Sequence, residues 1–117
     1  MLDVRAEWVL VYSNTEFESY LDFSSSKSDG DYLRVWHLLN FKSPQDVANK
    51  SNQSVEILWE IDCPGNRSRN LSSIWHVGEM GEGYINFADS LSTEWKNNIA
   101  HTLTHHIWLL MCSAISI

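Results

Sequence analysis

The chain has 117 residues, 44% of them hydrophobic, which suits one compact domain with a single core and argues against a largely disordered chain. Its 15 acidic and 8 basic side chains give a formal charge of −7, which disfavours nucleic acid as a partner because phosphate would be repelled. The longest apolar run near either end, residues 107–112, is far shorter than the roughly 20 residues that span a bilayer, so no membrane span is expected.

The first half of the chain predicts three β-strands. Residues 8–12 (WVLVY) form an apolar, β-branched run that indicates a central strand covered on both faces. A second strand is expected over 18–23, and Asp29 and Gly30 after it suit a tight turn with positive φ. Residues 31–42 alternate most clearly and predict the strongest strand.

The two faces of this third strand differ in character. The face expected to be buried carries Leu33, Val35, His37, Leu39 and Phe41, and the outer face carries Tyr32, Arg34, Trp36, Leu38 and Asn40. Residues 43–54 then lose all hydrophobic pattern and contain a proline and four side-chain amides. This segment is predicted to be a long exposed loop.

A hairpin is predicted around Pro64 and Gly65, whose order is typical of a type II turn. A two-residue loop would place Asp62 opposite Arg67 and Glu60 opposite Arg69, so that opposite charges pair twice on the outer face. The same register places Cys63 on the buried face. A further strand is expected over 83–87.

From Asn98 onward the apolar period changes to that of an amphipathic helix, with a stripe formed by Ile99, Leu103, Ile107 and Leu110. Cys112 follows near this stripe, so both cysteines point into the interface between sheet and helix. A bridge would close a loop of about 50 residues, contribute roughly 4 kcal/mol and imply an oxidising compartment. The alternative is a pair of buried, reduced thiols in a cytosolic protein.

These elements predict an α+β fold that is mainly β: about six antiparallel strands covered by a C-terminal helix and closed by one disulfide, in a single domain over residues 1–117. Several segments carry a family pattern in their order and spacing. They are 8–11 (WVLV), 20–25 (YLDFSS), 29–36 (DGDYLRVW), 59–63 (WEIDC), 67–69 (RSR), 94–95 (EW) and Cys112.

On these segments the chain resembles the surface-adhesin protein E family of small exported bacterial proteins. The resemblance implies a Cys63–Cys112 bridge, export to the periplasm or cell surface, and a signal peptide absent from this chain, since residues 1–5 lack a charged and apolar leader. It also implies an adhesin-like role toward extracellular-matrix proteins. The chain departs from the family at 98–100, where Asn-Ile-Ala stands in place of Pro-Gly-Ser.

Four outer-face residues are the candidate ligand-binding site: Arg34, Trp36, Arg67 and Arg69. A tryptophan beside guanidinium groups can make cation–π contacts or clamp an anion, and an exposed Trp36 would suit an interface anchor. The alternative is a solvated sheet face on which Glu60 and Asp62 neutralise the arginines.

Two histidines, His101 and His105, have the i,i+4 helical spacing that can share a metal ion. Two exposed histidines on a helix beside the core are the favoured explanation of the pair. His106 and His37 could add ligands in the fold, so zinc or heme-iron binding is a minor hypothesis. No catalytic residue is predicted, because neither a nucleophile elbow nor a base-activated cysteine is present. No cofactor is therefore expected.

The sequence thus predicts a non-enzymatic, exported binding module for a macromolecule, acting through a sheet face or the 43–54 segment as a monomer or weak dimer. A periplasmic metal- or heme-binding protein that uses His101 and His105 is the alternative. A third hypothesis is a structural envelope subunit that assembles through Trp36 or through the apolar tail at Ile115 and Ile117.

Overall fold

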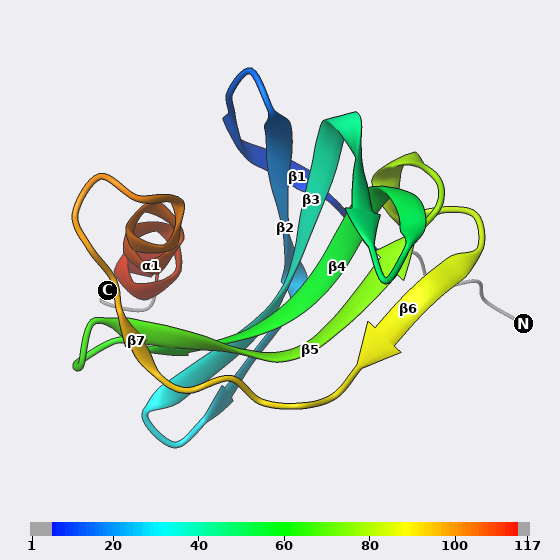
Figure 1. Ribbon diagram of the computed structural model, residues 1–117. Helices are drawn as coiled ribbons and strands as arrows, with labels where there is room; N and C mark the ends of the chain where they lie inside the picture. Colours follow the sequence, from blue (N-terminus) through cyan, green and yellow to red (C-terminus); the bar gives the residue numbers. More distant parts are fainter. Residues whose placement is uncertain (1–5, 115–117) are drawn as a thin grey trace, which may run out of the picture.

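The computed structural model describes residues 6–114, which form an antiparallel sheet and one C-terminal helix (Figure 1). The predicted mainly β fold is confirmed. In the sheet the strands follow the order β1-β2-β3-β4-β5-β6, and β7 pairs with β5. The elements are β1 (Val9–Ser13), β2 (Phe17–Asp29), β3 (Tyr32–Val47), β4 (Lys50–Asp62), β5 (Arg67–His76), η1 (Glu79–Gly81), β6 (Ile85–Asp89), β7 (Lys96–Asn97) and α1 (Leu103–Ala114).

The prediction that residues 8–12 form a central strand is wrong, because β1 lies at an edge of the sheet and pairs only with β2. Val9 and Leu10 are 47% and 52% exposed. Val11 alone packs against the core, on the side where His106 Nε2 lies 3.0 Å from the Val11 carbonyl oxygen. The apolar run reflects a β-branched edge strand that touches the helix, and a run of this length does not distinguish the two positions.

The segment 43–54, predicted to be a loop, is the paired tip of the β3–β4 hairpin. Gln45 pairs with Asn52 and Val47 pairs with Lys50, and the turn between them has φ of 54° at Ala48 and 60° at Asn49. Positive φ at both central residues is the geometry of a type I′ hairpin. The sequence pattern failed here because the tip has few apolar side chains to alternate. Backbone pairing holds it, together with side-chain hydrogen bonds such as that from Asn52 Nδ2 to the Gln45 carbonyl at 3.2 Å.

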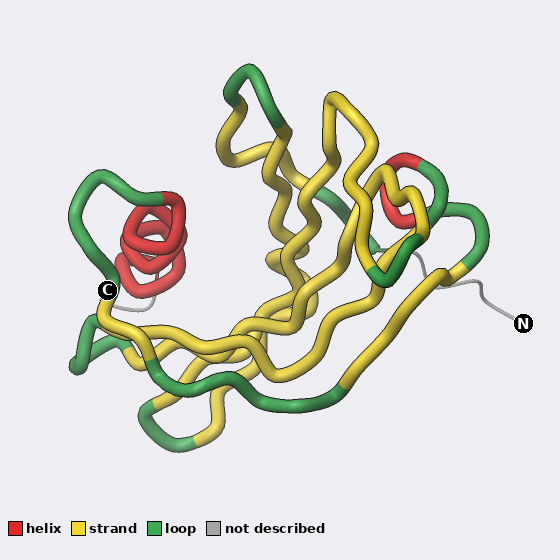
Figure 2. Tube along the Cα trace, in the orientation of Figure 1, coloured by secondary structure: helices red, strands yellow, loops and turns green. Residues whose placement is uncertain are grey.

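One face of the sheet is the core face, and α1 lies against it (Figures 1 and 2). The predicted alternation in β3 is confirmed there, since Leu33 and Val35 are buried. The helix contributes Ile107 and Met111 to the core, and both are buried. The predicted apolar stripe is correct only in part, because Ile99 lies before the helix and is 70% exposed. The core cluster comprises Leu21, Leu33, Val35, Trp59, Ile61, Ile107, Met111 and Cys112.

A short helical turn, η1, covers one end of the outer face. There η1 lies over β3 and β4, where the Met80 backbone N–H donates to Asn40 Oδ1 at 2.8 Å and the Gly81 N–H donates to Ser54 Oγ at 2.9 Å. Leu38 and Asn40, expected on an open face, are buried for this reason. The remainder of the outer face carries no helix among the described residues.

The β4–β5 turn has the predicted register but not the predicted type. Asp62 pairs with Arg67 and Glu60 with Arg69, as expected. The positive φ of 50° falls on Asn66 and not on Gly65, so the turn is not of type II and it ends on a left-handed residue. Asp62 Oδ1 accepts the Gly65 N–H at 3.0 Å, which closes the turn.

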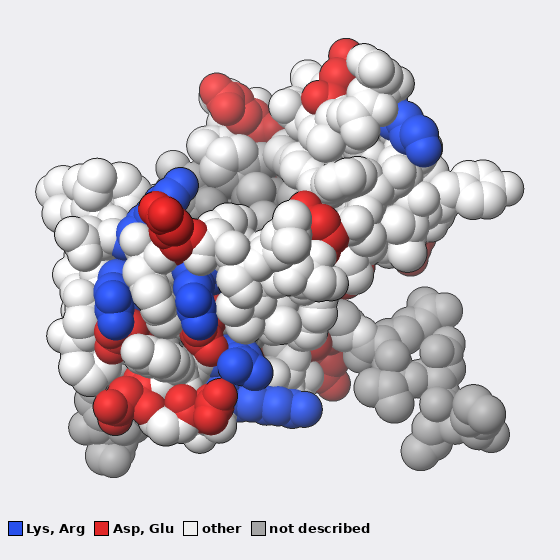
Figure 3. Space-filling view, turned by 60° about the horizontal axis from the view of Figure 1, so that its bottom comes forward, with Lys and Arg blue, Asp and Glu red and all other residues white. Residues whose placement is uncertain are grey.

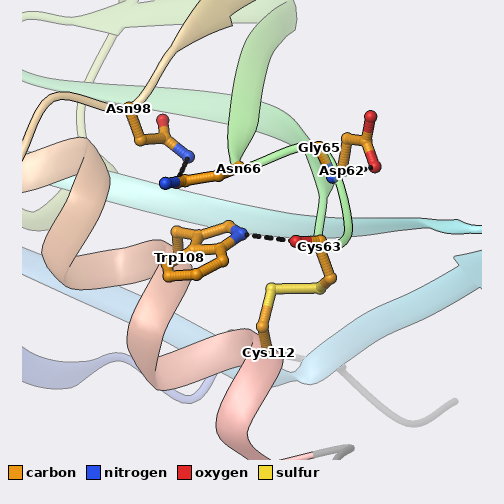
Figure 4. Close-up of a disulfide and its surroundings, with 7 residues drawn as sticks. All are labelled: Asp62, Cys63, Gly65, Asn66, Asn98, Trp108 and Cys112. Atoms are coloured by element: carbon orange, nitrogen blue, oxygen red, sulfur yellow. Dashed lines mark hydrogen bonds between the residues drawn. A yellow bond between two sulfur atoms is a disulfide. The ribbon is translucent and has the colours of Figure 1, made fainter.

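This turn binds the helical region at two places (Figure 4). The predicted disulfide is present between Cys63 and Cys112, with a Cα–Cα distance of 5.6 Å, and the Trp108 indole N–H donates to the Cys63 carbonyl at 3.2 Å. Before the helix, the Asn98 N–H donates to the Asn66 carbonyl at 3.0 Å. A helix of 12 residues is marginal by itself, so these links and its buried stripe hold it in place.

The double variant Cys63→Ser, Cys112→Ser tests the contribution of the bridge. The two cysteines are 49 residues apart, and the chain-entropy relation predicts a loss of about 4 kcal/mol of unfolding free energy. Urea unfolding followed by circular dichroism measures it. Reduced wild-type protein is the control and should match the variant; equal midpoints for oxidised wild type and variant would contradict the prediction.

Candidate functional site

Three of the four predicted binding residues, Arg34, Arg67 and Arg69, meet on the outer face in a row of ion pairs. Cross-strand pairing places Arg34 beside Glu60 on one side, and Arg69 beside Glu60 on the other. Figure 3 shows the consequence on this face, where basic and acidic side chains are interleaved and not separated by sign. The arrangement is closer to the predicted neutralised face than to an open anion clamp.

Glu60 is the centre of this row. Its side chain is 1% exposed, and its carboxylate accepts Arg34 Nε at 2.9 Å and Arg69 Nη2 at 2.7 Å. Burial alone would raise the pKa of the Glu60 carboxyl, but hydrogen bonds and charge attraction from the two guanidinium groups outweigh it and hold this pKa below its usual range. Glu60 is therefore ionised at neutral pH and orients both arginines.

Trp95 joins the arginines in place of Trp36, and the sequence reasoning did not select it as a site residue. The guanidinium carbons of Arg67 and Arg69 lie 4.6 and 4.5 Å from its ring centroid, and the Tyr32 ring lies 4.9 Å away. Trp95 comes from the irregular segment before β7, which Figure 2 shows running along the sheet. No local periodicity marks such a contact; its only signal was its place in the family pattern.

We name this cluster of Arg34, Glu60, Arg67, Arg69 and Trp95 the arginine–tryptophan cluster. Its guanidinium-bearing side chains remain 29–44% exposed, and Asp62 holds Arg67 Nε at 2.8 Å. Rigid, half-exposed arginine and tryptophan side chains are common anchors in protein interfaces. The cluster can therefore present a preformed contact surface with little loss of side-chain entropy.

Trp36 lies on the same face but outside this cluster. It pairs with Leu58 across β3 and β4 and borders a separate pocket with a volume of about 480 Å³. The predicted four-residue patch is therefore two features: a charge-paired cluster at one end and an aromatic pocket farther along the sheet.

The helical spacing assumed for His101 and His105 is wrong, because α1 begins at Leu103 and His101 lies in the preceding turn with φ of 70°. His105 stacks against Trp108, and His106 contacts the Val11 carbonyl. Within residues 6–114 no group of three histidine, cysteine or carboxylate side chains is placed to hold a metal ion. The zinc or heme site at this pair stays a prediction without geometric support.

His37, the other possible ligand, is fully buried inside the core face. Its Nε2 lies 2.7 Å from Ser19 Oγ, and its ring packs at a tilt of 52° against Trp59, with the ring centroids 4.6 Å apart. Burial lowers the pKa of His37 to about 3, so the ring is neutral at physiological pH. It is a packed core histidine that also satisfies Ser19.

These features define a class: a small, mainly β domain with one helix tied to the sheet by a disulfide and an outer face open over most of its length. A family profile described as "Surface-adhesin protein E" matches residues 8–113. The chain belongs to this surface-adhesin protein E family, which implies an exported surface protein.

Solved structures give the same fold. Crystal form II of Haemophilus influenzae protein E is similar with a TM-score of 0.76 at 15% identity, over 96% of this chain and 91% of that one. A second structure, of protein E from non-typeable Haemophilus influenzae, gives 0.72 at 14% identity over 95% and 78%. The search of curated protein sequences finds no match. Within residues 6–114 no helix combines the length and apolar character needed to cross a bilayer.

Glu60→Gln tests the centre of the cluster. The substitution removes the charge from two charge-assisted contacts, so the unfolding free energy at pH 7 should fall by about 2 kcal/mol. Because the folded pKa of Glu60 is depressed, its stabilisation is fully present at neutral pH and is lost as pH falls from about 4 through the lower folded pKa, so the gap between wild type and variant should narrow there. Urea unfolding from pH 7 to pH 3 measures this. Glu16→Gln, an exposed control, should change neither value; a gap independent of pH would contradict the prediction.

His37→Gln tests the buried histidine. The unfolded chain binds a proton near pH 6.5 and the folded chain only near pH 3, so wild-type stability should fall with decreasing pH between these values, by up to about 1.4 kcal/mol per unit. Glutamine can keep a hydrogen bond to Ser19 but does not titrate, so the variant should show a flatter slope. Unfolding free energies at pH 6.5, 5.5 and 4.5 decide this, and parallel curves would refute it.

Proposed function

We propose that this chain is a non-enzymatic, adhesin-like module that is exported to the periplasm or cell surface and binds a macromolecular ligand, of the extracellular-matrix type, through the outer face of its sheet. The observation that carries the proposal is the arginine–tryptophan cluster, which is rigid, half-exposed and not covered by any described element. Family membership supplies the class of protein, and the cluster supplies a surface suited to that class.

Geometry favours the outer face over the core face. The helix occupies the core face, whereas Arg67, Arg69 and Trp95 stay accessible on the other side. Guanidinium groups that are already oriented by carboxylates lose little freedom on binding, so they suit recognition of a polar protein surface. Their charges are balanced by Glu60 and Asp62, so affinity would come from shape and stacking more than from net charge.

A recognition role also agrees with the state of the reactive groups. Both cysteines are joined in the disulfide, so neither supplies a thiolate nucleophile. The buried carboxylate Glu60 is held ionised by two arginines, so it has no proton to donate at neutral pH and is a poor general acid. The bridge further supports an oxidising location outside the cytosol.

Binding to coated fibronectin, collagen and laminin, measured by biolayer interferometry, tests the proposal. At least one surface should bind the wild-type chain with micromolar or better affinity, and Trp95→Ala should weaken that binding by about 2 kcal/mol because it removes the platform on which both arginines stack. Leu91→Ala is the matched control, since Leu91 is 79% exposed on the segment that leads to Trp95. Circular dichroism confirms that both variants fold.

Absence of binding to all three surfaces would contradict the matrix-type ligand. Equal loss in Trp95→Ala and Leu91→Ala would contradict the role of the cluster.

A further inference from the structure

A pocket with a volume of about 480 Å³ opens on the outer face, away from the arginine–tryptophan cluster. It lies where β2, β3, β4 and β5 run side by side, and the segment before β1 forms one wall. The lining residues are Ala6, Trp8, Asp22, Ser24, Ser25, Trp36, Glu56 and Ile74. A neighbouring depression of about 410 Å³ shares Ala6, Trp8 and Glu56 with it.

The wall beside Trp36 is built by an irregularity in β2. Register with β3 breaks between Asp22 and Lys27, so the intervening residues bulge out of the sheet. Two contacts fix the bulge: Asp22 Oδ1 accepts the Ser24 N–H at 3.1 Å, and Ser25 Oγ accepts the Trp36 N–H at 3.0 Å. The pocket wall is therefore set by hydrogen bonds and is preorganised.

The pocket has a strongly one-sided charge. Among the described residues that line it, Asp22 and Glu56 are the only charged ones, and none is a lysine or an arginine. Asp22 is 6% exposed. Ser24 binds its Oδ1, and its Oδ2 makes no hydrogen bond to another described residue. Glu56 is fixed by His76, whose Nε2 donates to Glu56 Oε2 at 2.6 Å. Both carboxylates are held in place with a formal charge of −2 between them.

Two indole rings, those of Trp8 and Trp36, line the same space. Tryptophan is the best aromatic partner for an organic cation, and partly desolvated carboxylates add charge attraction. We propose that this pocket binds the cationic end of a lysine or arginine side chain presented by a partner protein. The chain's excess of acidic over basic residues, 15 against 8, steers such a partner toward it.

The inference goes beyond the proposed function, because it concerns a second site and a defined chemical group. Its test needs no matrix protein, so failure of matrix binding and failure of cation binding are separate results.

The probe is Nα-acetyl-lysine methylamide, whose only charge is the side-chain ammonium. Titration into 15N-labelled protein, followed by the indole N–H signals in NMR spectra, should shift the signals of Trp8 and Trp36 with a dissociation constant on the order of 1 mM, as suits a ligand of this size. The doubly acetylated lysine, matched in shape but uncharged, should cause no saturable shift. Trp95, in the arginine–tryptophan cluster, should not respond to either compound.

Variants assign the effect to the pocket. Trp8→Leu should weaken binding about tenfold through loss of a cation–π contact, and Glu56→Gln should weaken it about threefold to tenfold through loss of charge. Glu79→Gln, outside the pocket lining, is the matched control and should keep the wild-type affinity. Arg5→Gln should also keep it; a tenfold gain would mean that the chain's own arginine competes for the pocket, which overturns the assignment to a partner. Equal response to the neutral analogue, or no saturable shift up to 50-fold above the expected constant on the order of 1 mM, would overturn it too.

Discussion

The attachment of α1 to the β4–β5 turn is the constraint on which the rest of the structure depends. The turn holds the helical region at two points, through Asn66 to Asn98 before the helix and through the Cys63–Cys112 bond near its end. Between these points Ile107 and Met111 fill the core face of the sheet. A single short helix cannot cover a seven-stranded sheet completely, so its position decides which surface is core and which remains available.

The composition of the outer face follows from the position of the helix on the opposite face of the sheet. With the helix on the other side, several buried polar groups on the outer face are satisfied by neighbouring strands, the β4–β5 turn or η1: Glu60 by two arginines, Asp62 by Arg67 and its own turn, and Asn40 and Ser54 by η1. A face assembled from paired charges can stay exposed without becoming an apolar patch that aggregates. It also keeps its side chains ordered, which lowers the entropic cost of binding.

Prediction from the sequence succeeded for features that are determined by residues close together in the chain. Alternation in β3, the pairing of Glu60 with Arg69 and the meeting of the two cysteines all follow from period and register, which short segments determine. It failed where the cause lies elsewhere in the chain. The edge position of β1 depends on which strand pairs with it, and the hairpin at 43–54 depends on backbone pairing without apolar side chains.

The candidate site divides in the same way. Cross-strand neighbours on the outer face could be read from the register, so Arg34, Arg67 and Arg69 were placed together. Trp95 could not, because it reaches the arginines from an irregular segment more than 20 residues beyond them, after β6. The sequence analysis grouped Trp36 with the arginines because its side chain points to the same face of the sheet. A shared face determines which way a side chain points, but not whether two side chains are in contact. Separation along the strand placed Trp36 two residues from Arg34 and nearer the bulge in β2.

The low identity to protein E structures, 15% with a TM-score of 0.76, has a physical reading in these terms. A core tolerates the exchange of one apolar residue for another of similar size, and strand register tolerates the exchange of one cross-strand pair for another. A fold can therefore be kept while most of its sequence changes. Surface features have no such tolerance, because a ligand reads particular side chains. The outer face here carries two neighbouring features of different character, a charge-balanced cluster around Trp95 and an anionic pocket between Trp8 and Trp36. A ligand that used both would need a polar surface for stacking and a basic side chain at a fixed distance from it, and that geometric requirement would select among partners more strongly than either feature alone.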